Sequence, residues 1–339
     1  MKTFRYDELT WPEVTALPRH MPLVLPLGPA PSAVDLHAAL PTDGPIGVLP
    51  SIPYGWAGSG LDVPASLLSA MVSNLLAGLE EDGFTRVVAC MPPGVTLNLG
   101  AREITLKPEK AASPLSIPER SDRRVVVIPI GHTEQHGYHL ALNVDTVIID
   151  AIGRGTAAAV PQEAIALPAM PYGVSTHRRS FAATLNCGGR AFEDFWGGVV
   201  DALVGRGWDR FYFLSGHGGN CSFLTTVVKY AGERHPSIFA ATAWLYLNGP
   251  AGVAALDELR QSKIGGMGHA CELETALMLH LAPHLTWMDR VVDEIEFIST
   301  PAYYMDWVEG GALVANPPWE DDTATGSYGA GSLGTAEKG

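Results

Sequence analysis

The sequence predicts an α/β protein whose mostly parallel sheet is covered by helices on both faces, preceded by a shorter α/β half-repeat. Three observations predict this fold: β-branched runs alternate with helical periodicity, glycine-rich polar motifs follow two of the runs, and an early part of the chain echoes a later one. Of the 339 residues, 47% are hydrophobic and 17% are charged. This balance provides for a large buried core and is not typical of disordered chains.

The elements of the later unit follow in order along the chain. The β-branched run from Val125 to Ile130 predicts a strand at about 124–130. A helix is expected from about Asp145, because a carboxylate is favoured in the first turn of a helix. The elements that follow are predicted as a strand at 164–168, a helix at 191–206 that Gly207 ends, a strand at 210–214, a helix at 221–234 and a strand at 238–245. Alternating β and α elements imply a mostly parallel sheet.

The early part of the chain repeats the first half of this unit. Three segments echo later ones in the same order: Leu25–Gly28 and Ile128–Gly131, Leu49–Gly55 and Leu167–Gly173, Leu79–Val88 and Leu203–Tyr212. We therefore expect a degenerate half-repeat over residues 1–95; the alternative is that ordinary βα units share turn chemistry by accident. Residues 96–123 are polar and contain prolines, which predicts a linker with a short β-ribbon around 102–106.

Composition also limits the kinds of partner that the protein is expected to bind. The chain carries 22 Lys and Arg against 36 Asp and Glu, a net charge of −14, which argues against nucleic acid because phosphate binding requires clustered Lys and Arg. No apolar run reaches the length of a membrane span, and the first residues form no apolar signal core. We expect a soluble, cytoplasmic protein with a small-molecule substrate and with neither a nucleic-acid nor a membrane partner.

The cysteines do not predict a disulfide framework or a zinc site. Cys90, Cys187, Cys221 and Cys271 are widely spaced and form no Cys-x-x-Cys pair. All four are interpreted as reduced residues that behave as small hydrophobes. Cys221 and Cys271 lie next to polar motifs in the sequence, so a nucleophilic role for either stays open.

Two carboxylates and two imidazoles lie in the stretches that follow predicted strands. Glu134 and His136 are two residues apart, so in an extended segment both side chains point to the same side. Asp145 follows them in the same part of the chain, and His217 lies in a glycine-rich stretch after another strand. Because open parallel sheets bind ligands outside the carboxyl ends of their strands, these residues predict a divalent metal site.

The half-repeat lacks this chemistry. Alignment of the echoes places three residues at the positions of Glu134, His136 and His217, namely Pro31, Ala33 and Pro93. Proline and alanine side chains cannot bind a metal. The first copy is therefore expected to be a structural or assembly module.

A third polar motif precedes a predicted helix near residue 272. His269 lies there in a glycine-rich loop, which suits a mobile general acid or base. Glu272 and Glu274 stand in the first turn of that helix. Acidic residues at this position also simply stabilise the helix dipole, and this alternative fits at least one of the two.

Further residues are weaker candidates for substrate binding: Tyr172, Ser175, His177, Gly218 and Trp244. Trp244 ends a predicted strand and either gates the site or packs in the core. His177 and the two arginines after it either bind an anionic substrate or lie on a solvated loop. The backbone amide of Gly218 is a candidate for stabilising an oxyanion.

Together these motifs resemble the creatininase (creatinine amidohydrolase) family. The resemblance covers about residues 121–339 and rests on residues 134–140 with Asp145, 171–175, 181–186, 216–220, 268–275 and the tail 326–339. It implies a three-layer α/β/α, creatininase-like catalytic domain, assigned to residues 124–339, that holds two divalent ions and assembles as a homo-oligomer. The ions implied are zinc with a second zinc, manganese or iron.

The resemblance also assigns roles to residues. Four fall on ligand positions: Glu134, His136, Asp145 and His217. Asp145 would bridge the ions, and His269 falls on the proton-transfer position. Creatininase itself carries a glutamate two residues after the histidine of its second motif, where this chain has Gly219. Either the second ion is missing or another carboxylate replaces this glutamate, for which Glu274 is the candidate, and the departure argues against creatinine as the substrate.

The sequence therefore predicts a metal-dependent hydrolase that cleaves a small cyclic amide or amide-like substrate through a metal-bound hydroxide. Two alternatives stay open: hydrolysis of a C–C or ester bond in a cyclic keto compound at the same metal site, and a non-catalytic assembly protein. A further helix would be expected after Gly339, so the chain is interpreted as trimmed at its C-terminus.

Overall fold

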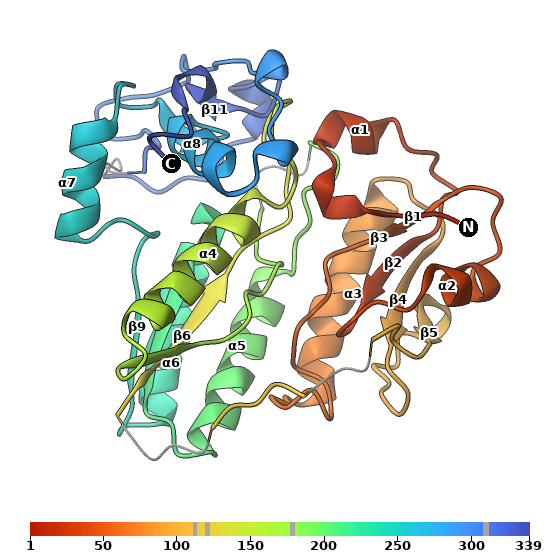
Figure 1. The fold of residues 1–339 in the computed structure, drawn as a ribbon. Helices are drawn as coiled ribbons and strands as arrows, with labels where there is room; N and C mark the ends of the chain where they lie inside the picture. The colour runs from red at the N-terminus through yellow and green to blue at the C-terminus, as the bar shows by residue number, and fades with distance from the viewer. Residues whose placement is uncertain (111–113, 119–122, 177–179, 308–311) are drawn as a thin grey trace.

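Two parallel sheets pack against each other through helices, and the C-terminal segments lie over one end of the second sheet (Figure 1). The computed structural model describes residues 1–110, 114–118, 123–176, 180–307 and 312–339. None of the helices in these ranges has the length and apolar character that a membrane crossing requires.

The N-terminal sheet is parallel throughout, in the order β1-β3-β2-β4-β5. Its strands are β1 (Thr3–Arg5), β2 (Leu23–Pro26), β3 (Ile46–Val48), β4 (Val87–Met91) and β5 (Glu103–Thr105). Its helices are α1 (Trp11–Thr15), α2 (Ala33–Ala39) and α3 (Ala65–Glu81). Strands β2 and β4 are buried along their whole length, as expected for strands covered on both faces. The predicted linker ribbon is wrong, because β5 pairs in parallel with β4 as an edge strand of this sheet.

The second sheet is also parallel, in the order β7-β6-β8-β9. Its strands are β6 (Val125–Ile130), β7 (Ala164–Ala166), β8 (Arg210–Ser215) and β9 (Phe239–Thr242), and its helices are α4 (Val144–Ala159), α5 (Gly189–Val204) and α6 (Cys221–Arg234). Helix α4 covers one face, and α5 and α6 cover the other (Figure 1). The predicted mostly parallel α/β fold is confirmed. Strand β9 is shorter than predicted, because the Leu245 N–H donates to the side chain of Asn248 and not to β8.

The C-terminal region contains fewer regular elements. They are α7 (Pro250–Leu259), β10 (Met267–His269), α8 (Glu272–Leu281) and β11 (Tyr328–Gly329). Strands β10 and β11 pair antiparallel. Helix α8 packs against α4, which brings this region to the end of the second sheet where β6 and β8 terminate.

The two halves share one hydrophobic core. Helix α3 packs against α5, and fully buried residues of both helices, such as Leu75 and Trp196, belong to the same apolar cluster. At Gly55 the halves approach so closely that an added Cβ would lie 2.9 Å from the ring of Phe195. The N-terminal half is therefore packed into the same body as the second sheet.

The halves also share a topology. In each sheet a first strand lies between the second and third, as β2 lies between β3 and β4 and β6 between β7 and β8. The aligned residues make the same backbone hydrogen bonds: Gly28 donates to Ile52 and Gly131 to Met170, both at 2.9 Å, while Leu49 donates to Val24 and Leu167 to Val127. These equivalences support the proposal that the halves are copies of one unit.

Candidate metal centre

The sheet order creates a crevice between the ends of β6 and β8. The chain leaves β6 through α4 on one face and reaches β8 through α5 on the other, and ligands bind at such switch points. Residues 131–145 connect β6 to α4, and His217 follows β8. The four predicted ligands are each no more than 2% exposed: Glu134, His136, Asp145 and His217.

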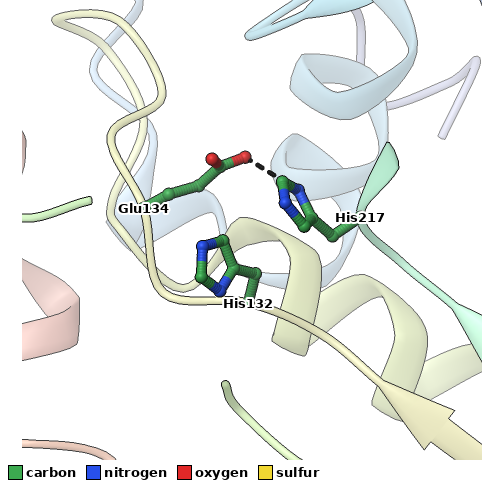
Figure 2. A group of neighbouring side chains, drawn as sticks. All are labelled: His132, Glu134 and His217. Atoms are coloured by element: carbon green, nitrogen blue, oxygen red, sulfur yellow. Dashed lines mark ion pairs between the residues drawn. The ribbon is translucent and has the colours of Figure 1, made fainter. Parts of the chain in front are cut away.

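These side chains meet in one buried cluster. His217 Nδ1 lies 3.1 Å from Glu134 Oε1 and 3.3 Å from Asp145 Oδ2; Figure 2 shows the contact with Glu134. On the other side, His136 Nε2 lies 3.1 Å from Asp145 Oδ1 and 3.8 Å from Glu274 Oε1. Asp145, in the first turn of α4, therefore presents one carboxylate oxygen to each of two imidazoles.

Backbone carbonyls orient both imidazoles. His217 Nε2 lies 2.9 Å from the carbonyl oxygen of Val174, and His136 Nδ1 lies 3.1 Å from that of Glu134. A carbonyl oxygen only accepts hydrogen bonds, so these two nitrogens carry the protons. In the neutral rings, the nitrogens left with a lone pair are the two that face the carboxylates. Metal-binding histidines in proteins are held in this way.

The carboxylates strongly favour positive charge in this cluster. Burial opposes a charged His136, but Asp145 and Glu274 outweigh burial and raise the pKa of His136 to about 10. In the same way, Glu134 and Asp145 outweigh burial and raise the pKa of His217 to about 9. A divalent cation would supply the positive charge that protons otherwise supply, and nitrogen and oxygen donors suit zinc, manganese or iron.

We expect metal binding to release protons and to strengthen as the pH rises. In the metal-free protein His136 and His217 are protonated at neutral pH, since their pKa values are about 10 and 9, whereas a ligating imidazole must be neutral. Because folding raises the pKa values of His136 and His217, the protonated imidazoles stabilise the metal-free protein. This contribution is fully present below about pH 6.5 and is lost as the pH rises through 9 and 10. Titration calorimetry with Zn²⁺ in buffers of different ionisation enthalpy measures the release. A Zn²⁺ affinity that does not change between pH 6 and 9 would contradict the protonation of His136 and His217 in the metal-free protein.

The backbone at Gly219 leaves no room for a carboxylate side chain. A Cβ at this position would lie 2.2 Å from the carbonyl oxygen of Val174 and 2.4 Å from His217 Nε2. No side chain fits there without displacing the oriented imidazole. Glu274, in the first turn of α8, lies 3.8 Å from His136 Nε2, and its role as a ligand stays a prediction.

His269 lies within the same cluster, but the prediction of a mobile loop was wrong. The residue ends β10 and is 2% exposed. Its Nε2 donates to the carbonyl oxygen of Gln135 at 2.6 Å, and its Nδ1 lies 3.6 Å from Glu134 Oε1. Its ring lies 4.2 Å from that of His136. Pairing of β10 with β11 and the bond to Gln135 together hold the imidazole in place.

His132 belongs to the site and was missed. Its ring stacks on His217 with centroids 4.4 Å apart, beside Glu134 (Figure 2). Its Nδ1 accepts the Gly173 N–H at 2.9 Å, so in the neutral ring the proton sits on Nε2 and neither nitrogen offers a lone pair to a metal. The two-residue spacing that predicted a shared site for Glu134 and His136 also includes residue 132. The same argument could therefore have predicted His132.

The cluster opens into a cavity of about 460 Å³, within the range of small-molecule sites. At one end lie Glu134, Asp145, His217, His269 and Glu274, and much of the remaining wall is apolar, including Phe223, Trp244, Leu245, Met305, Trp307 and Val314. Gly218 also lines the cavity, and Trp244 is 47% exposed beside it. The structure thus places these two residues at the cavity, and their contact with a substrate stays a prediction.

Other predicted substrate contacts are not at the cavity wall. Tyr172 is fully buried, and its hydroxyl donates to the carbonyl oxygen of Pro50 at 2.5 Å, in the core between the halves. Ser175 is also fully buried and does not line the cavity. The structure therefore places neither side chain at the cavity, because both are enclosed in the protein interior. His177 lies outside the described residues.

Replacing Tyr172 with phenylalanine should lower stability and leave turnover unchanged. The substitution removes one buried hydrogen bond to Pro50, which is worth about 0.5–1.5 kcal/mol of unfolding free energy and leaves a carbonyl unsatisfied. Urea unfolding and steady-state rates measured on the same preparation check this. A large fall in kcat with unchanged stability would restore Tyr172 to the active site.

The remaining polar residues of these motifs have structural roles. Burial raises the pKa of the Cys221 thiol to about 12 and that of Cys271 well above its ordinary value, so both stay protonated and are poor nucleophiles. Glu272 accepts hydrogen bonds from Lys338 and from the backbone amides of Gln261 and Ser262. Of the two acidic residues in the first turn of α8, only Glu274 faces the cluster.

The chain is similar in sequence to a known family and to named proteins. The family model described as creatininase, creatinine amidohydrolase, matches residues 114–339. A mycofactocin precursor peptide peptidase of Mycobacterium ulcerans is 33% identical over 178 residues, which cover 49% of this chain and 62% of that protein. The creatinine amidohydrolase of Pseudomonas putida is 28% identical over 183 residues, which cover 50% of this chain and 68% of that protein.

Solved structures show the same fold. A structure titled as the manganese form of creatininase superposes with a TM-score of 0.53 at 24% identity, over 64% of this chain and 84% of that one. A zinc–zinc form of a creatininase variant superposes equally well, with a TM-score of 0.53 at 24% identity over 64% of this chain and 83% of that one. The chain thus spans about three-fifths of the length of the mycobacterial relative and most of the length of these structures.

Proposed function

The chain belongs to the creatininase family of metal-dependent amidohydrolases, and from this we propose that it hydrolyses the C–N bond of a small cyclic amide or amide-like substrate. The observation that carries the proposal is the placement of Asp145, which turns one oxygen toward His217 and the other toward His136. A carboxylate placed in this way suits a bridge between two cations.

The donor set divides into two groups that share Asp145. Glu134 and His217 complete one group, and His136 and Glu274 complete the other. We propose zinc in one position, with a second zinc, manganese or iron in the other. A divalent cation bound here lowers the pKa of water toward neutrality and polarises a carbonyl group.

The protein's own residues would orient the substrate and move the proton. His269 lines the cavity beside Glu134, and its Nε2 is held by Gln135, so its Nδ1 is the atom that would pass a proton to the leaving nitrogen. Gly218 begins the short 3-10 helix Gly218–Asn220 that leads into α6, and its amide would donate to a developing oxyanion. The apolar wall would exclude water from the far side of a bound substrate.

A peptide amide is the second candidate substrate. The relative from Mycobacterium ulcerans is named as a peptidase, and a cavity of about 460 Å³ with a largely apolar wall has room for more than a small ring. Hydrolysis of a C–C or ester bond in a cyclic keto compound stays an alternative at the same site, as does a non-catalytic assembly role. Assembly as a homo-oligomer stays a prediction from sequence.

Metal analysis combined with a substrate screen tests the proposed function. The purified protein is analysed for zinc, manganese and iron, then assayed with lactams, formamides, short peptides, lactones and cyclic diketones, before and after chelation and metal replacement. We expect at least one ion per chain and amide cleavage that disappears on chelation and returns with metal. Cleavage of only lactones or diketones would favour the keto alternative, and a protein without metal or activity would favour assembly.

A further inference from the structure

The N-terminal half holds the beginning of helix α4, where Asp145 stands. The Leu142 N–H donates to the carbonyl oxygen of Leu9 at 3.0 Å. Asn143, the residue before α4, does not cap the helix with its side chain; its Nδ2 instead donates to Asp7 Oδ2 at 3.3 Å. Two residues that directly precede the first turn of α4 are thus bonded to the other half of the molecule.

Asp7 is itself firmly anchored in the N-terminal sheet. It lies in the 3-10 helix η1 (Tyr6–Glu8), is 2% exposed, and accepts two hydrogen bonds from the guanidinium of Arg5, at 2.9 and 2.7 Å. Arg5 ends β1, which pairs in parallel with β3. A buried carboxylate is costly unless it is paired and hydrogen-bonded, so this arrangement fixes one oxygen of Asp7 at the start of α4.

A second contact from the same half reaches the opposite side of the cluster. Trp11 opens α1, and its indole N–H donates to the carbonyl oxygen of Thr325 at 2.8 Å. The next residue, Gly326, accepts a hydrogen bond from the side chain of Gln135 at 2.9 Å. Gln135 stands between Glu134 and His136. Contacts from the N-terminal half therefore reach the segments that carry three of the proposed ligands.

We propose that the ligand-free N-terminal half positions the metal centre, and that Asp7 is the positioning residue, acting through Asn143 on Asp145. The half-repeat has Pro31, Ala33 and Pro93 where the second copy has Glu134, His136 and His217, yet it supplies contacts that hold the ligand-bearing segments. This inference rests on the proposed metal centre and gives the first copy a role beyond bulk stability.

The test measures the dissociation constant for Zn²⁺ of the full chain by competition with a chromogenic chelator, without any assay of turnover. The variants are Asp7→Ala, Asn143→Ala and the double variant. Asp7→Asn keeps an acceptor oxygen for Asn143 and serves as the conservative rescue. The matched control is Asp150→Ala, which removes a carboxylate from α4 that pairs with Arg154 at 2.7 Å near the surface. Unfolding midpoints are recorded for the metal-free proteins.

We expect Asp7→Ala and Asn143→Ala each to weaken Zn²⁺ binding about 10-fold. This is the smallest loss of metal affinity usually caused by removing a residue that orients a ligand without binding the metal itself. The double variant should be no weaker than the weaker single variant, because both remove the same bond. Asp7→Asn and Asp150→Ala should bind within about two-fold of the wild-type chain. Should Asp7→Ala fail to fold, Asn143→Ala tests the same bond from the other side.

Three results would overturn the inference. The first is wild-type affinity in a folded Asp7→Ala or, where that variant does not fold, in Asn143→Ala. The second is multiplication of the two single losses in the double variant, which would make them independent. The third is equal weakening by Asp150→Ala. A wild-type chain that binds no Zn²⁺ would instead sink the proposed function.

Discussion

Replacing Asp145 with alanine is expected to weaken metal binding by more than about 100-fold and to abolish hydrolysis. Partners outside the ligand set cost about 10- to 100-fold in metal affinity when they are removed, and Asp145 faces both imidazoles directly at 3.1 and 3.3 Å. The loss should reach both ions at once, because one carboxylate serves both donor groups. Metal content after dialysis, together with the competition measurement, checks this expectation.

The control for the Asp145 variant is Glu134→Ala, which removes a carboxylate from one donor group and not from both. Glu134 contacts His217 and His269, so its removal should empty one position and leave the other partly filled. Retention of two ions per chain by the Asp145 variant would contradict a shared carboxylate. Equal depletion by both variants would indicate a single ion.

Replacing His269 with alanine should reduce turnover by about 10²–10⁴-fold while leaving metal content unchanged. The residue lines the cavity and is held by Gln135 with its other nitrogen 3.6 Å from Glu134, a geometry suited to moving a proton. Rates under saturating substrate and metal content are measured on the same samples.

The structure also offers a direct rival to this role. Ligand atoms of Glu134, His136 and His269 lie within 4.8 Å of one another, which would allow His269 to bind a cation. A variant that loses an ion along with its activity would make His269 a ligand. An active variant with full metal content would exclude both roles.

Much of the fold was predictable because its signals are local. The β-branched run that forms β6 and the glycines that end α5 report on backbone preference and burial along a short stretch. Asp145 was placed correctly at a helix start, because helix dipoles favour carboxylates there. The meeting of Glu134, His136, Asp145 and His217 in one cluster followed from the rule that parallel strands bring their ends to one edge.

The errors concern contacts that the sequence does not encode locally. Tyr172 follows a strand in a motif, yet its hydroxyl bonds to Pro50, over a hundred residues earlier, in a core shared by both halves. His269 sits among glycines that suggested a loop, but pairing with β11, far along the chain, makes the segment a strand. Met305 and Trp307 line the cavity from a region without regular periodicity. Such long-range packing overrides local preference.

The N-terminal half shows the same limit in another way. Its alignment with the second half predicted the absence of ligands at Pro31, Ala33 and Pro93, and the shared topology supports the alignment. The hydrogen bond from Asn143 to Asp7 has no counterpart in any sequence pattern, because it depends on how the halves pack. The missing ligands of the first copy could therefore be predicted from the sequence, whereas its contacts with the second half could not.

The central claim is that buried carboxylates and imidazoles at the ends of β6 and β8 bind divalent cations. Anomalous diffraction from crystals of the zinc-loaded protein, recorded on both sides of the zinc absorption edge, tests it most directly. The account predicts two peaks flanking Asp145, one within bonding distance of Glu134 and His217 and the other within bonding distance of His136 and Glu274. A fully loaded crystal whose peaks lie away from these side chains would contradict it.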